Sequence, residues 1–183
     1  LPRELKLVSH PNEGFVLKGY LTAEFENIGI KWENLQTQSR KYSADSPAAF
    51  ALGKADAFDY EVELVMSDND QAIIELSNIQ NEKVDIVLDK TLQQLRVNRF
   101  QSGEQSFSAD FPAEIKAPAN IKDTVLVRLV IDQSSVEVFL DEGMLQVTNI
   151  VFPLEIYNKV TIKSGKEVSV IKSKVRKLKS IWR

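Results

Sequence analysis

The 183-residue sequence contains no cysteine, which excludes disulfides, thiolate metal sites and a cysteine nucleophile. It has a single histidine, so a multi-histidine zinc site is also excluded. His10 stands beside Pro11 and is expected to be a solvated loop residue. No G-x-S-x-G motif is present that would give this histidine a serine nucleophile to activate. We therefore expect no metal site and no cofactor.

The sequence also lacks long apolar runs and any excess of positive charge. No run approaches the length of a membrane span, so no membrane span is expected. A net charge of -3 and a pI near 5.4 give no electrostatic reason to expect nucleic acid as a partner. The basic run at 172–179 has no interleaved aromatic residues and is interpreted as a solvated strand face. Because the chain starts with Leu1 rather than Met, we expect a piece of a longer protein.

The dominant pattern is alternation of apolar and polar residues, which is typical of half-buried strands. It is clear in "FDYEVELVM" (58–66), "KVDIVLD" (83–89) and "TVLVRLVID" (124–132), and it returns in later runs to residue 182. Turn residues such as "SDND" (67–70) and "KSGKE" (163–167) separate these runs at short intervals. The sequence predicts an all-β, two-sheet antiparallel sandwich and no convincing helix. Residues 46–56 contain helix formers, but Pro47 and Gly53 confine them.

Several carboxylates lie close together in "RLVIDQSSVEVFLDEG" (128–143), and they admit two interpretations. In a straight strand Asp132 and Glu137 would lie about 17 Å apart on opposite faces, although a hairpin could bring them closer. The alternative is a turn in which Asp132 accepts hydrogen bonds from the amides of Ser134 or Ser135. Gly143 would then adopt a positive φ in the next turn. We predict the second, structural role for these carboxylates.

Two further features suggest ligands. The segment "SDNDQAIIE" (67–75) weakly resembles a calcium loop, but Ala72 stands where such a loop needs glycine, and a solvated hairpin turn is predicted. Trp32 and Trp182 could stack on sugar rings, although tryptophans in a domain of this size more often serve packing.

The run "DQSSVEVFLDEG" and the "FP" at 152–153 resemble the C-terminal β-sandwich module of family 32 glycoside hydrolases, which include levanases, inulinases and invertases. "LPREL" (1–5), "LQQLRVNRFQSGEQSF" (92–107), "APA" (117–119) and "LKSIW" (178–182) extend the resemblance, which is strongest over 92–153. The sequence departs from the family at Gln133 and Ile150, where many members have arginine, and at Asn98, where aspartate is expected.

The resemblance implies a lectin-like jelly roll with about six strands per sheet, and one domain spanning 1–183. Residues 1–10 would be a lead-in from an N-terminal five-bladed propeller, which carries the family's catalytic residues in motifs like N-D-P-N-G, R-D-P and E-C. None of these motifs occurs here. The chain alone is therefore expected to have no catalytic residues and no enzyme activity. The parent would be a retaining fructan hydrolase, extracellular or periplasmic.

Two functions follow from this resemblance. In the first, the domain stabilises its intramolecular partner, the propeller, and shapes the active-site rim or a homodimer contact. In the alternative, it is a carbohydrate-binding module for fructan oligosaccharides or other glycans. The second function predicts an exposed aromatic platform, for which Trp32, Tyr42 and Tyr157 are the candidates.

Overall fold

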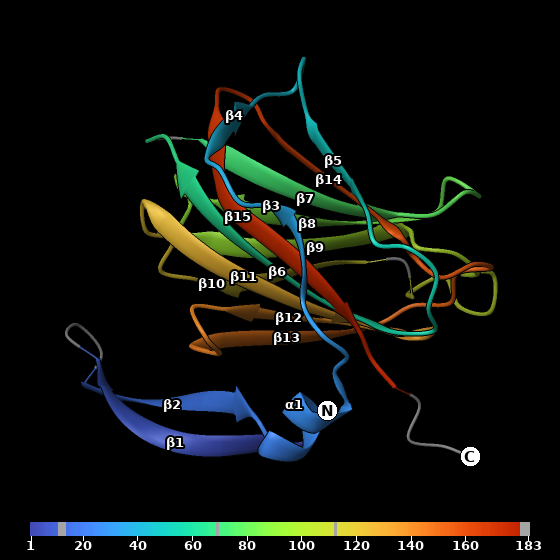
Figure 1. Ribbon diagram of the computed structural model, residues 1–183, viewed down its shortest axis with the longest axis horizontal. Coiled ribbons are helices and arrows are strands. Elements are labelled where there is room, and N and C mark those ends of the chain that lie inside the picture. Colours follow the sequence, from blue (N-terminus) through green and yellow to red (C-terminus); the bar gives the residue numbers. More distant parts are fainter. Residues whose placement is uncertain (11–13, 69, 112, 180–183) are drawn as a thin grey trace.

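The computed structural model describes residues 1–10, 14–68, 70–111 and 113–179, and it is built almost entirely of strands (Figure 1). The elements are β1 (Arg3–His10), β2 (Gly14–Leu21), α1 (Ala23–Ile28), β3 (Glu33–Gln36), β4 (Arg40–Tyr42), β5 (Ala48–Ala51), β6 (Phe58–Met66), β7 (Gln71–Ser77), β8 (Lys83–Asp89), β9 (Gln94–Gln101), β10 (Glu114–Pro118), β11 (Thr124–Ile131), β12 (Ser135–Leu140), β13 (Leu145–Ile150), β14 (Lys159–Ser164) and β15 (Val168–Lys177).

Two antiparallel sheets face each other and form the predicted sandwich. One has six strands in the order β10-β9-β8-β7-β14-β5. The other has the order β13-β12-β11-β6-β15-β3, and β4 also pairs with β15, which makes seven strands. The prediction of about six strands per sheet is confirmed. The predicted final strand is also confirmed as β15, although it ends at Lys177.

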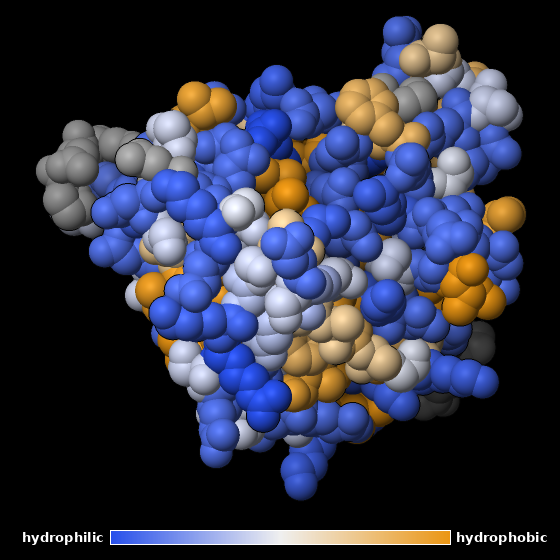
Figure 2. Space-filling model, turned by 90° about the horizontal axis from the view of Figure 1, so that it is seen from above, coloured by the Kyte–Doolittle hydropathy of each residue, from blue (hydrophilic) through white to orange (hydrophobic). Residues whose placement is uncertain are grey.

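The core lies between the two sheets because alternate residues of each strand point inward. Tyr60, Val62 and Leu64 of β6 are fully buried, as are Ile74 and Leu76 of β7 on the opposite sheet. A shift of one residue in the pairing would turn these side chains to the solvent, so their burial fixes the register. Figure 2 looks down on the molecule from above the view of Figure 1 and shows a largely hydrophilic surface with apolar atoms in separate patches.

The first two strands lie apart from both sheets of the sandwich. β1 and β2 form a two-stranded hairpin, from Arg3 paired with Leu21 to His10 paired with Gly14. This hairpin (β1–β2, called the hairpin below) lies beside β12 and β13, outside the two layers of the sandwich (Figure 1). His10 ends β1 and is half-buried, so its prediction as a solvated loop residue is wrong.

A short helix, α1, follows the hairpin at a position where no helix was predicted. The Thr22 hydroxyl caps it by accepting a hydrogen bond from the Phe25 amide (3.4 Å). Phe25 is the buried residue of this helix and packs with Val130 and Phe139 of the seven-stranded sheet. Six residues make one and a half turns, so α1 depends on this packing rather than on intrinsic propensity. In the described part of the chain no helix is long and apolar enough to cross a membrane.

Candidate functional site

The carboxylates of residues 128–143 divide into two groups. Asp132 accepts hydrogen bonds from the amides of Ser134 (2.8 Å) and Ser135 (2.6 Å), which confirms its predicted role in the turn. Asp141 accepts from the amide of Leu126 (3.2 Å). Gly143 has a φ of 92°, as predicted.

The other two carboxylates of this region do not hold the backbone; they bind the hairpin. Glu137 is buried and accepts a hydrogen bond from Arg3 of β1 (2.6 Å). Glu142 forms an ion pair with Lys18 of β2 (3.1 Å). The prediction that all these carboxylates pin main-chain amides is therefore wrong for Glu137 and Glu142. Within the described ranges no three acidic or histidine side chains gather as a metal site requires.

Backbone contacts complete this junction between the hairpin and the β12–β13 turn. The Gly19 amide donates to the Gly143 carbonyl (3.1 Å), and the Gln146 side-chain amide donates to the Gly19 carbonyl (3.1 Å). The chains approach so closely that a Cβ on Gly19 would overlap Gln146, and one on Gly143 would overlap the Gly19 carbonyl oxygen. Glycine is therefore required at Gly143, which has a positive φ and meets backbone, whereas a side chain at Gly19 would displace the flexible end of Gln146.

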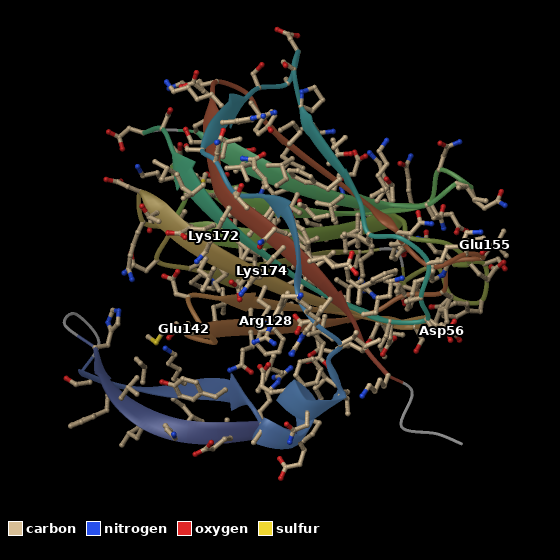
Figure 3. All side chains as sticks on the ribbon, in the orientation of Figure 1. Asp56, Arg128, Glu142, Glu155, Lys172 and Lys174 are labelled. Atoms are coloured by element: carbon tan, nitrogen blue, oxygen red, sulfur yellow. The ribbon has the colours of Figure 1, made fainter. Side chains whose placement is uncertain are left out.

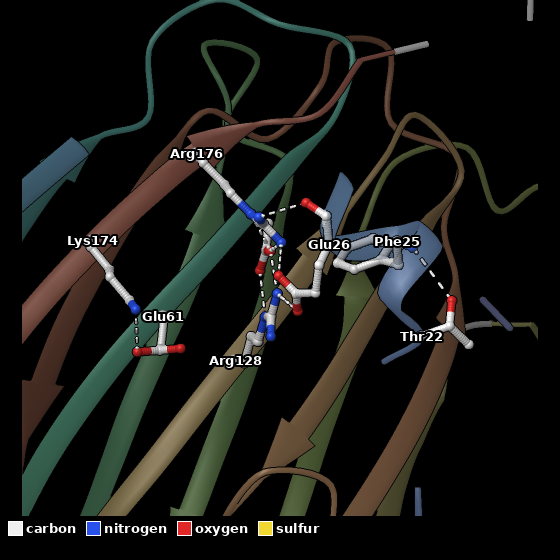
Figure 4. Close-up of polar contacts among 8 residues, drawn as sticks. Thr22, Phe25, Glu26, Glu61, Arg128, Lys174 and Arg176 are labelled. Atoms are coloured by element: carbon white, nitrogen blue, oxygen red, sulfur yellow. Dashed lines mark hydrogen bonds and ion pairs between the residues drawn. The ribbon is translucent and has the colours of Figure 1, made fainter. Parts of the chain in front are cut away.

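A network of two arginines and two carboxylates holds α1 against the same sheet (Figure 4). Asp59 of β6 is fully buried and accepts from Arg128 of β11 (2.6 and 2.8 Å) and from Arg176 of β15 (2.8 Å). Glu26 of α1 pairs with both arginines, at 2.8 and 2.6 Å. Arg176 also donates to the Glu26 carbonyl (3.1 Å). We call these four residues the arginine clamp.

The clamp is electrostatically consistent, because each buried charge has a partner of opposite sign. Burial acts to raise the pKa of Glu26, but hydrogen bonds and charge from Arg128 and Arg176 hold that pKa below its ordinary value. Burial acts to lower the pKa of the Arg128 guanidinium, but its bonds to Asp59 and Glu26 raise it. Glu26 and Arg128 are therefore both charged at neutral pH, and neither is poised to transfer a proton.

Trp32, the first predicted sugar-stacking residue, lies over the clamp and is half-buried. The Lys174 ammonium lies 4.3 Å from the ring centroid, and the Arg176 guanidinium lies 4.7 Å from it. Arg128 is also near, at 5.7 Å. The ring thus takes part in cation–π contacts with the sheet. Lys174 also forms an ion pair with Glu61 (2.9 Å).

The other two aromatic candidates lie elsewhere. Tyr42 is half-buried and donates its hydroxyl to the Gln36 side chain (2.7 Å). Tyr42 pairs with Val168 of β15. Val168 lies six residues, or roughly 20 Å, along the strand from Lys174, the residue that contacts Trp32.

Tyr157 is fully buried, and its hydroxyl donates to the Ser102 carbonyl (2.6 Å). Burial raises the pKa of this phenol. The prediction of Tyr157 as an exposed sugar-binding residue is therefore wrong. The structure does not bring the three candidates into one platform, and Trp182 lies outside the described residues.

A polar cleft of about 380 Å³ lies between the hairpin and the seven-stranded sheet. Its walls carry the carboxylates of Glu26, Glu61 and Glu142 and the cations of Arg128 and Lys172. Figure 3 labels Arg128, Glu142 and Lys172 along the part of the sheet that faces the hairpin. Side chains of this kind can exchange hydrogen bonds with a hydroxylated ligand, although each already has a partner of opposite charge: Arg128 and Glu26 pair with each other, and the others pair with residues outside the cleft.

The segment that weakly resembles a calcium loop is a turn, as predicted. The Asp70 carboxylate accepts from the amides of Gln71 (2.7 Å), Lys166 (3.2 Å) and Glu167 (3.3 Å) and from the Ser164 hydroxyl. These donors, two of them from the β14–β15 turn and one from the last residue of β14, occupy the oxygens that a cation would need. Asn69 lies outside the described residues.

Comparison with known proteins identifies the fold and the family. Residues 25–179 match the family described as "Glycosyl hydrolases family 32 C terminal". The levanase of Bacillus subtilis (strain 168) is 27% identical over 195 residues, a match that covers 100% of this chain and 27% of the levanase.

Two solved structures share the fold. The exo-inulinase from Aspergillus awamori superposes with a TM-score of 0.80 at 19% identity, covering 99% of this chain and 36% of that one. The sucrose-6-phosphate hydrolase from Lactobacillus gasseri has a TM-score of 0.71 at 14% identity, covering 97% of this chain and 33% of that one. This chain thus spans about a third or less of these relatives. Because the family match covers most of the sequence, the chain belongs to the family of C-terminal domains of family 32 glycosyl hydrolases.

Proposed function

We propose that this chain is the non-catalytic C-terminal sandwich of a longer fructan-hydrolysing enzyme of the levanase, inulinase or invertase type. The observation that carries the proposal is the use of the carboxylates around the β12–β13 reversal. Asp132 and Asp141 bind backbone amides, while Glu137 and Glu142 bind the hairpin. None of these four is left as the second carboxyl of a glycosidase pair.

The sandwich would then act by stabilising an N-terminal catalytic propeller. The junction and the arginine clamp support this role, since they fix the N-terminal segment of the chain on one face of a rigid sheet. A second domain joined to that segment would keep a defined orientation relative to the sandwich. The extracellular or periplasmic location and the homodimer stay predictions.

The test is fructose release from sucrose, levan and inulin by purified residues 1–183. We expect no release above a buffer control, and release by the full-length protein. Turnover by residues 1–183 that Glu137→Gln abolishes, with folding retained, would overturn the proposal.

The polar cleft favours a second function, binding of fructan oligosaccharides. Carboxylates and cations lining one groove can bind vicinal hydroxyl groups, and the cleft has room for a small part of a sugar chain. Calorimetry with levan and inulin oligosaccharides at millimolar concentration tests this. Binding heat that Glu61→Gln and Lys172→Ala both reduce would support the second function, and absence of heat would exclude it.

A further inference from the structure

One face of the hairpin is apolar and uncovered. Leu5 and Leu7 of β1 are 60% and 67% exposed, and Phe15 and Leu17 of β2 are 74% and 58% exposed. Leu7 pairs directly with Leu17, and Leu5 and Phe15 lie two residues away on the two strands, so the four share one face of the ribbon.

The opposite face of the hairpin meets the sandwich along the middle of the ribbon, whereas near α1 the apolar face also reaches it, through Arg3 bound to Glu137 (2.6 Å). Lys18, the neighbour of Leu17, points to Glu142 (3.1 Å). Val16 and His10 line a second cleft together with Met144 and other residues near the β12–β13 turn. Because successive side chains of a strand alternate between faces, the leucines point away from the sandwich.

An uncovered hairpin of this kind is incomplete by itself. A two-stranded ribbon is marginally stable in water, and large exposed apolar patches mark interaction surfaces. Within the described part of the chain, β1 pairs with β2 alone. The outer edge of β1 therefore offers backbone hydrogen-bonding groups to a further strand.

The comparisons show where this hairpin recurs. The family of C-terminal domains matches from Phe25 onward and leaves the hairpin outside. The levanase match nevertheless covers this whole chain, and the exo-inulinase superposition covers 99% of it. The hairpin is thus shared with relatives that are about three times longer or more, yet it lies outside the C-terminal domain family.

We propose that β1 and β2 belong structurally to the N-terminal domain of the full-length protein. The outer edge of β1 continues a sheet of that domain, and Leu5, Leu7, Phe15 and Leu17 pack into its core. The domain boundary then falls at Thr22, where α1 begins, rather than near residue 10. This proposal depends on the proposed function in one respect only: both require the chain to be part of a longer protein.

The test uses full-length protein carrying Leu7→Asp and Leu17→Asp together. The matched control is Leu92→Asp, since Leu92 is 61% exposed in the β8–β9 turn of the other sheet. Hydrogen exchange is measured for peptides from residues 3–21 and from 124–131. In the wild type and the control we expect exchange over 3–21 to be at least tenfold slower than in the double variant, with 124–131 equal in all three.

Equal exchange over 3–21 in the double variant and the wild type would overturn the proposal. So would protection that rises with protein concentration alongside dimer formation by light scattering, because the cover would then be a second copy. If the aspartate variant does not accumulate, Leu7→Ser with Leu17→Ser provides the same comparison. Hydrogen exchange is measured independently of enzyme activity. If the full-length protein does not hydrolyse fructans, the proposed function is contradicted, but the exchange result still tests the position of the hairpin.

Discussion

The sandwich and the hairpin share the same alternating sequence pattern and differ in what the pattern buries. In β6, Tyr60, Val62 and Leu64 are fully covered by the facing sheet. In the hairpin, Leu7 and Leu17 are more than half exposed, because no second layer lies over them in the described structure. Alternation thus creates an apolar face, but only a second layer buries it. The sandwich contains both of its layers, and the hairpin contains one.

The largest expected effect on stability is the loss of a phenylalanine side chain from the sandwich, compared with the same loss from the hairpin. Phe58 of β6 is fully buried in the core, whereas Phe15 is 74% exposed. Phe58→Ala should lower the free energy of unfolding of residues 1–183 by about 3–5 kcal/mol, since it removes buried area and leaves a cavity. Phe15→Ala should change it by less than about 0.5 kcal/mol. Urea unfolding followed by circular dichroism measures both, and equal losses would remove the distinction between the regions.

The next effect concerns the arginine clamp, which holds α1, the element that follows the hairpin, against the sandwich. Asp59→Ala leaves Arg128 and Arg176 without their shared buried partner, and it should cost about 3 kcal/mol of unfolding free energy. The control is Asp68→Ala, which removes a carboxylate that is highly exposed and pairs with Lys90, and we expect it to cost much less than Asp59→Ala. A cost for Asp59→Ala no larger than that of the control would show that the clamp does not stabilise the domain.

A smaller effect is expected at the Asp132 turn. Asp132→Ala removes the acceptor of the Ser134 and Ser135 amides and should destabilise the domain by about 1 kcal/mol, with no change in the far-ultraviolet spectrum. Asp45→Ala, at another exposed turn, is the control and should stay within about 0.5 kcal/mol of wild type. Complete unfolding of the Asp132 variant would mean that the turn directs folding.

The smallest effect is a pH dependence at α1. The folded pKa of Glu26 is lower than its ordinary value of 4.5, so the unfolded chain binds the proton more tightly. The Glu26 contribution is present above pH 4.5 and is lost as the pH falls through the lower, folded pKa. Glu26→Gln should flatten the decline of stability below pH 4.5, whereas Glu24→Gln, at an exposed position of the same helix, should not. Parallel acid curves for the wild type and Glu26→Gln would contradict the clamp electrostatics.

The strands of the sandwich could be predicted from the sequence because burial on one face imposes a period of two. The Asp132 turn could be predicted because the interaction is local: carboxylate and amides lie within three residues. The hairpin could not, because the sandwich does not bury its apolar face. The helix α1 could not, because its buried residue, Phe25, packs against Val130 and Phe139, which are more than 100 residues away in the sequence.

The clamp was missed because its members lie 33 to 150 residues apart in the sequence. A signal existed: the outward positions of β6 are acidic (Asp59, Glu61 and Glu63), and those of β15 are basic (Lys172, Lys174 and Arg176). Two complementary alternating runs predict neighbouring strands. Tyr157 was misplaced because a single aromatic residue in a loop has no periodic pattern to indicate its burial.

The most direct test of the account is to delete residues 1–21 and measure urea unfolding of residues 22–183. We expect one cooperative transition, a slope with denaturant close to that of residues 1–183, and a loss of stability of no more than about 2 kcal/mol, because the core lies between the two sheets. Loss of the cooperative transition would show that the hairpin is part of the folding unit of the sandwich, which would contradict the account.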